Sequence, residues 1–185
     1  STVDLLKIQK LYQEKRYSEV VFEIELSTTE KNRSSFLHNL LGVCRASQKG
    51  KTDRDVQYAL NDFETAFYKD NLGQISLDAL RGHITLCAEM GRKESALVNN
   101  FLISEKMYLK AEKKYSKNDK YLTHGIDLYK YLNKHEKRIS KTLEIIKIKG
   151  LNKIFGTILI SSQMYLNNWS QKDFREFQKG FSKIF

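Results

Sequence analysis

Hydrophobic residues recur at intervals of three or four along most of the chain, which is the period of a helix with one buried face. In residues 3–15 this pattern places Leu5, Ile8 and Leu11 on one side. No segment shows the strict alternation of a half-buried strand. We therefore predict an all-α chain of about ten helices, over residues 3–15, 18–27, 34–47, 54–69, 75–90, 93–115, 119–133, 136–149, 152–166 and 171–184.

Composition favours the same fold class. The 185 residues include no proline and nine glycines, the residues that β-rich proteins use in their turns. The apolar run 154–160 is far shorter than the ~20 residues of a membrane-spanning helix, so we expect no membrane span. Cys44 and Cys87 lie in apolar helical segments, and no signal peptide is apparent, so we expect reduced, buried thiols in a cytoplasmic protein.

Two neighbouring segments carry small residues where helices have to pack closely. The stretch LHNLLGV contains Gly42, and ALNDFETAF contains Ala59 and Ala66 with Phe63 between them. Antiparallel helices approach closely where side chains are small, so we expect Phe63 to fill the space where the two helices diverge. This spacing resembles the tetratricopeptide repeat, which has Leu-Gly in its first helix and Ala-x3-Phe in its second, at a period of ~34 residues.

The resemblance implies antiparallel hairpins stacked as a right-handed α-solenoid. It covers residues 1–108, with hairpins at about 3–27, 34–69 and 75–106, and it leaves 109–185 as additional C-terminal helices that pack on the array. The sequence departs from the family pattern at three positions. His38 stands where Trp is preferred, Arg45 stands where Tyr is preferred, and Asn71 replaces the closing Pro. A plain helical bundle that uses small residues at its crossings is the alternative.

In such arrays the first helix of each hairpin lines a concave surface that binds extended peptides or helices. The resemblance therefore implies eight partner-binding residues: Gln9, Tyr12, Gln13, Asn39, Val43, Arg81, Thr85 and Glu89. Asn39 and Arg81 are the strongest candidates, because an amide bonds a peptide backbone in both senses and a guanidinium clamps a carboxylate. The expected function is a scaffold for a protein or peptide partner, acidic partners included. A solvated helix face is the alternative at each position.

Positive charge is concentrated in the second half of the chain. The formal net charge is +10, and residues 106–153 contain 14 lysines and arginines against five acidic residues. Lysines neutralise phosphates and the interleaved tyrosines can stack on bases, so a nucleic-acid-binding module is an alternative function. The tyrosines fall at helical spacing with leucine and isoleucine, however, and Arg138 is the only arginine there, which favours a core role for the rings.

Two short stretches resemble catalytic or metal-binding motifs, but each lacks a residue that its motif requires. The GKT stretch has Arg45 where a phosphate-binding loop needs glycine. The stretch HEKRI has Ile139 in place of the second histidine of a zinc-protease helix. We therefore expect no catalytic residues, no cofactor and no metal site, and thus no enzyme activity in this chain.

The C-terminal end gives one further alternative. YLNNWSQKDFREF includes Trp169 and resembles the helix pair that follows the repeats in O-linked N-acetylglucosamine transferase-like proteins. A core position for Trp169 is the simpler interpretation. Ser170 and Asp173 have the spacing of a capping box, and a phenylalanine stripe follows at Phe174, Phe177, Phe181 and Phe185. The chain starts without methionine, so we expect the non-catalytic, N-terminal part of a longer protein or the arm of a glycosyltransferase-like enzyme.

Overall fold

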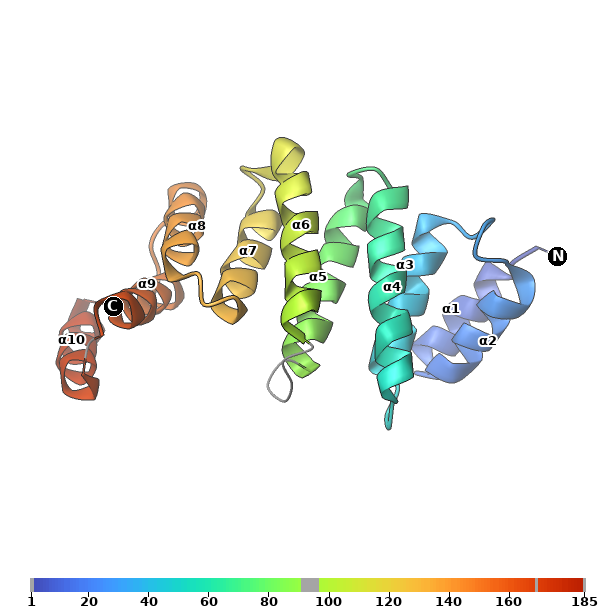
Figure 1. Cartoon of the computed structure of the whole chain (residues 1–185), viewed down its shortest axis with the longest axis horizontal. Coiled ribbons are helices and arrows are strands. Elements are labelled where there is room, and N and C mark those ends of the chain that lie inside the picture. The colour runs from blue at the N-terminus through green and yellow to red at the C-terminus, as the bar shows by residue number, and fades with distance from the viewer. Residues whose placement is uncertain (1, 91–96, 169, 185) are drawn as a thin grey trace. The chain divides into compact units, whose positions relative to one another are not determined.

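A computed structural model describes residues 2–90, 97–168 and 170–184. These ranges form ten helices and no strands, which confirms the predicted all-α fold and the order of its elements (Figure 1). Most boundaries fall within two residues of those predicted. The helices are α1 Leu5–Gln13, α2 Tyr17–Ser27, α3 Ser35–Ser47, α4 Asp53–Lys69, α5 Gln74–Met90, α6 Leu97–Tyr115, α7 Asp119–Tyr131, α8 His135–Lys149, α9 Lys153–Asn167 and α10 Gln171–Ile184.

Polar side chains at the helix starts explain several of these boundaries. The Ser34 hydroxyl accepts a hydrogen bond from the Leu37 N–H ahead of α3, at 3.2 Å. Thr52 and Asp55 form a reciprocal capping box at the start of α4. The predicted box before α10 is also present, since Asp173 N–H donates to the Ser170 hydroxyl at 3.2 Å. Trp169 and the side chains of the predicted phenylalanine stripe lie outside the described residues.

The chain divides into two compact units, Ser1–Leu97 and Val98–Phe185. The division falls after the first residue of α6, whereas the expected boundary after residue 108 lies in the middle of that helix. The expected third hairpin, 75–106, therefore spans the division. Among the described residues, no helix is long and apolar enough to cross a membrane.

In the first unit, helices that follow one another in sequence pack against one another. α1 pairs with α2 and α3 pairs with α4, while α5 packs on both α3 and α4. One core cluster joins α1, α2 and α3 through Ile8, Leu11, Val20, Ile24, Leu37, Leu41 and Cys44. Cys44 and Cys87 are both buried free thiols, as predicted, and burial raises the pKa of Cys44 to about 12.

Phe63 of α4 lies against two glycines on two other helices. A Cβ atom added to Gly42 of α3 would lie 2.7 Å from the ring, and one added to Gly82 of α5 would lie 2.5 Å from it. The ring therefore occupies the space of two missing side chains, rather than a gap where α3 and α4 diverge. Ala59 and Ala66 are fully buried on the same helix, as the repeat-like spacing predicted.

The second unit has a similar arrangement built on tyrosine. Tyr108 of α6 stacks on Tyr121 of α7, with ring centroids 4.1 Å apart, and Tyr129 meets it edge-on at 5.7 Å. A Cβ atom at Gly125 of α7 would overlap the Tyr108 hydroxyl. These three tyrosines are buried, which confirms their predicted core role. Arg138 of α8 is also buried and donates from Nε to the Ile126 carbonyl at 3.1 Å.

His83 is the buried histidine next to Gly82 on α5. Its side chain is 1% exposed, and the Cys87 sulfur lies 3.7 Å from its Nδ1 atom. Burial disfavours the charged imidazolium and lowers the pKa of His83 to about 4. The folded state therefore holds this histidine neutral at a pH where the unfolded chain begins to take up a proton.

Replacing Gly82 with alanine is expected to destabilise the first unit by about 2 kcal/mol, since overpacking a core costs about 1–3 kcal/mol. Urea unfolding followed by circular dichroism measures this change. The matched control is Gly180→Ala on α10, where no described atom lies within 4 Å of the added Cβ. There we expect alanine's higher helix propensity to leave stability equal or higher. Equal losses in both variants would contradict the contact with Phe63.

Acidification should destabilise the fold through His83. Burial depresses its pKa in the folded state to about 4 from the ordinary histidine value of 6.5, so its contribution is complete above pH 6.5 and is lost as the pH falls toward 4. Linkage then predicts a loss of about 2 kcal/mol between about pH 7.5 and pH 5 from this group. Urea titrations of the wild type and of His83→Gln at both pH values test it. The variant should lose about 2 kcal/mol less than the wild type over this interval.

Candidate functional site

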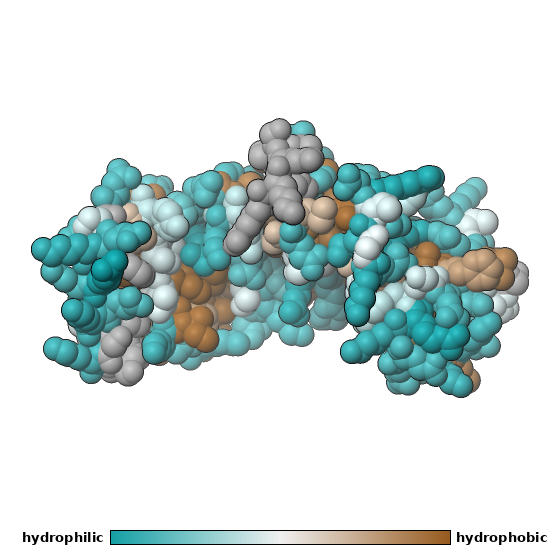
Figure 2. Space-filling model, turned by 90° about the horizontal axis from the view of Figure 1, so that it is seen from below, coloured by the Kyte–Doolittle hydropathy of each residue, from teal (hydrophilic) through white to brown (hydrophobic). Residues whose placement is uncertain are grey.

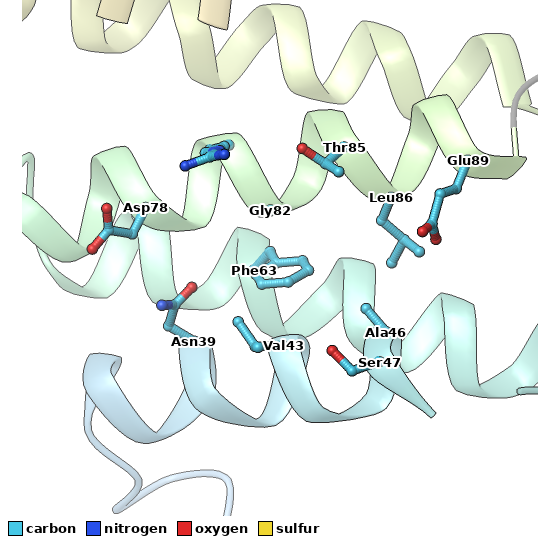
Figure 3. Close-up of a pocket in the computed structure, with 11 residues that line it drawn as sticks. Asn39, Val43, Ala46, Ser47, Phe63, Asp78, Gly82, Thr85, Leu86 and Glu89 are labelled. Carbon is cyan, nitrogen blue, oxygen red and sulfur yellow. The ribbon is translucent and has the colours of Figure 1, made fainter. Parts of the chain in front are cut away.

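A groove of about 450 Å³ lies on the first unit, between α3 and α5. Figure 3 shows residues of α3 along one wall and residues of α5 along the other, with Phe63 of α4 between them. The lining residues are Asn39, Val43, Ala46, Ser47, Phe63, Asp78, Arg81, Gly82, Thr85, Leu86 and Glu89. The groove is thus built by the same three helices that meet around the Phe63 ring.

Helical periodicity explains the two walls. Asn39, Val43 and Ser47 follow one another at intervals of four on α3. Arg81, Thr85 and Glu89 do the same on α5, and residues at this spacing share one helix face. Because Gly82 has no side chain, α5 packs directly on the Phe63 ring, which lies beneath the groove and is only 2% exposed.

The structure brings together five of the eight residues implied by the repeat resemblance: Asn39, Val43, Arg81, Thr85 and Glu89. Gln9, Tyr12 and Gln13 are not among the lining residues. They are exposed on α1, where the Tyr12 ring meets Tyr17 of α2 edge-on at 5.8 Å. The resemblance implied that α1, α3 and α5 line one surface. Residues of α3 and α5 line the groove, whereas the three residues of α1 do not.

Charges in the groove are arranged around Arg81. Within the described part of the chain, this exposed guanidinium makes no hydrogen bond and no ion pair. Asp78 accepts a hydrogen bond from the Gln74 amide at 3.4 Å. At the other end, Lys51 Nζ lies 3.5 Å from the Glu89 carboxylate and offsets its charge. The cation of Arg81 is therefore left available to an anionic group of a ligand.

Asn39 supplies an unsatisfied hydrogen-bonding group. Its Oδ1 atom is buried and accepts no hydrogen bond from any described residue. Buried amide oxygens in folded proteins nearly always have a donor. Figure 3 shows the Asn39 amide at the groove, on the wall opposite α5. An amide side chain carries both an acceptor and a donor, so Asn39 is a lining residue with hydrogen-bonding capacity left unused.

A buried polar cluster joins α3 to α4 next to this wall. His38 Nδ1 lies 3.3 Å from one carboxylate oxygen of Asp62, and Arg45 pairs with the other oxygen. Arg45 also pairs with Glu25 of α2. His38 and Arg45 are two of the three positions that depart from the repeat pattern, and here they share one acid. The cluster holds α3, and with it Asn39, against α4.

Burial is the largest influence on the Asp62 carboxyl. It raises the pKa of that group, and the charge of Arg45 and the hydrogen bond with His38 work in the opposite direction. The Asp62 side chain is 8% exposed and that of Arg45 is 11% exposed. A buried carboxylate at this position is tolerated because both of its oxygens have partners.

Sequence reasoning missed Asp62 and Gly82. Asp62 comes three residues after Ala59 and four before Ala66, so the helical period already placed it on the buried face of α4. An acid on an apolar face needs a cationic or donor partner, and Arg45 was available on the preceding helix. Gly82 lies in the middle of α5, where glycine is unfavourable. Its presence there indicated that a neighbouring helix packs closely against this position.

The basic second unit contains several internal ion pairs. Lys134 Nζ lies 2.8 Å from Glu105, Lys141 lies 3.2 Å from Glu144, and Lys149 lies 3.1 Å from Asp119. The tyrosines that would have to stack on bases are largely in the core. Among the described residues, no group of three or more His, Cys, Asp or Glu side chains is placed to hold a metal ion.

Comparisons with known proteins give no relative. No family model matches the chain, and no curated protein or solved structure matches it significantly. The groove has therefore to be interpreted from its own geometry.

Removing the Asp62 carboxylate is expected to destabilise the first unit. Asp62→Ala leaves Arg45 and His38 buried without their shared acceptor, and breaking a buried pair costs about 3–5 kcal/mol. Chemical unfolding of Asp62→Ala and of Asp55→Ala measures the difference. Asp55 is the comparison because it is an acid of the same helix that serves an exposed cap. If the Asp62 variant loses no more stability than the Asp55 variant, the cluster does not hold α3 against α4.

Proposed function

We propose that this chain is a tetratricopeptide-like interaction module that holds an extended segment of a partner protein in the groove between α3 and α5. The observation that carries the proposal is that Asn39 and Arg81 lie on opposite walls of one groove. The buried amide oxygen of Asn39 accepts no hydrogen bond, and the guanidinium of Arg81 pairs with no acid among the described residues. A peptide main chain and a carboxylate supply the groups that these two side chains lack.

The remainder of the lining fits such a ligand. Val43 and Ala46 on the α3 wall are partly exposed and offer contact to an apolar side chain of the partner, while Thr85 and Ser47 offer hydroxyls along the walls. Arg81 favours an acidic side chain or a C-terminal carboxylate beside that apolar residue. In this proposal the module is not catalytic, and it serves as the binding arm of a longer protein. Nucleic acid on the basic segment and the arm of a glycosyltransferase-like enzyme are the competing assignments.

Selection from a random peptide library on the immobilised wild-type protein tests the proposal. The dissociation constants of the selected peptides are then measured by fluorescence anisotropy. Arg81→Gln is expected to weaken binding about 10- to 100-fold, because hydrogen bonds to charged groups contribute about 1.5–3 kcal/mol. Asn39→Leu keeps the shape of the side chain and is expected to weaken binding about tenfold.

Two matched controls keep the test specific. Arg54→Gln removes the same charge from α4, where Arg54 is exposed and donates to the Tyr58 hydroxyl at 2.9 Å. Asn61→Leu removes an exposed amide of the same helix that bonds Gln57. Selected peptides that bind all four variants equally would show that the groove is not the site. Failure to select peptides, together with tight binding of oligonucleotides, would instead favour the nucleic-acid assignment.

A further inference from the structure

The turn between α8 and α9 is exposed over eight consecutive residues. These residues, 147–154, have the sequence KIKGLNKI, and every one of them is exposed. At the centre, Gly150 has a φ of +83°, and no described atom lies within 4 Å of the position a Cβ would take. The turn therefore projects away from the packed helices. We call residues 147–154 the α8–α9 turn.

Aliphatic side chains make up part of this turn. Ile148 is 50% exposed, Leu151 is 51% exposed and Ile154 is 69% exposed. Figure 2 shows apolar areas over both units, on a surface that is otherwise largely hydrophilic. Three large, exposed aliphatic residues thus fall within seven positions of one turn. Single exposed apolar residues are common on proteins, whereas a contiguous cluster marks a contact surface.

Three lysines, Gly150 and Asn152 make up the remainder of the turn, and acidic residues are absent from it. Lys147, Lys149 and Lys153 are interleaved with the aliphatic residues. Lys149 lies 3.1 Å from Asp119 and remains half exposed. Lys147 and Lys153 are exposed and form no ion pair within the described residues. The contact surface is thus apolar and cationic at once.

We propose that the α8–α9 turn docks on an anionic lipid surface. Aliphatic side chains enter the boundary between headgroups and acyl chains, while lysine stems extend to place their ammonium groups at the phosphates. Acidic headgroups supply the negative charge that the turn lacks. Nucleic acid is a poorer match, since the turn offers neither an aromatic ring for base stacking nor an arginine. The docking does not depend on the groove, which belongs to the other unit.

Vesicle flotation with the full chain tests the apolar half of this proposal. Wild-type protein should float with phosphatidylcholine vesicles that contain about 30% phosphatidylserine, and it should not float with phosphatidylcholine alone. Leu151→Ser/Ile154→Ser should reduce the bound fraction at least tenfold. The control is Leu102→Ser/Leu109→Ser on α6, whose side chains are 48% and 46% exposed, and it should float like the wild type.

A second pair of variants tests the charges. Lys147→Gln/Lys153→Gln should weaken vesicle binding about 25-fold, from about fivefold for each lysine near an anionic membrane. Lys106→Gln/Lys113→Gln removes the same charge from exposed positions on α6 and should have little effect. Absence of vesicle binding by the wild type overturns the proposal, as does equal loss in the turn and control variants. Binding of a single-stranded oligonucleotide in place of vesicles also overturns it.

Discussion

The contact of one aromatic ring with two glycines determines how the first unit is packed. Phe63 of α4 lies where the side chains of Gly42 and Gly82 would be. Both α3 and α5 therefore pack against the same aromatic ring. The groove lies above this contact, with the buried ring beneath it and its walls on α3 and α5. Any residue larger than glycine at position 82 would meet the Phe63 ring and disturb the packing that holds the two walls.

Next to this contact, a buried polar cluster joins α3 to α4. His38 and Arg45 stand where the resemblance leads one to expect Trp and Tyr, and both bond to Asp62. An ion pair of this kind is directional, because it is stable only when both carboxylate oxygens have partners. The cluster can therefore fix the rotation of α3 about its own axis, and with it which α3 side chains reach the groove.

The sequence was a good guide to the helices because periodicity and helix caps are local. Ser34, Thr52 and Ser170 each begin a helix where the pattern predicted one. The repeat-like spacing also placed Asn39 and Arg81 on one surface, and both residues line the groove. It failed at Asp62 and Gly82 because their roles depend on residues of other helices. A search for buried-face positions with the wrong polarity or size would have found both before the structure was known.

The groove and the α8–α9 turn place two different chemistries on separate units. The groove combines one arginine with one amide, and such a site selects a ligand by the position of its hydrogen-bonding groups. The turn offers exposed aliphatic side chains and lysines around Gly150, of which Lys149 also pairs with Asp119, and such a surface responds to charge and apolar character but hardly to shape. A chain with both features can recognise a peptide specifically while adhering to a surface nonspecifically. Substitutions in the groove should therefore weaken peptide binding and leave vesicle binding unchanged. Substitutions in the α8–α9 turn should have the opposite effect.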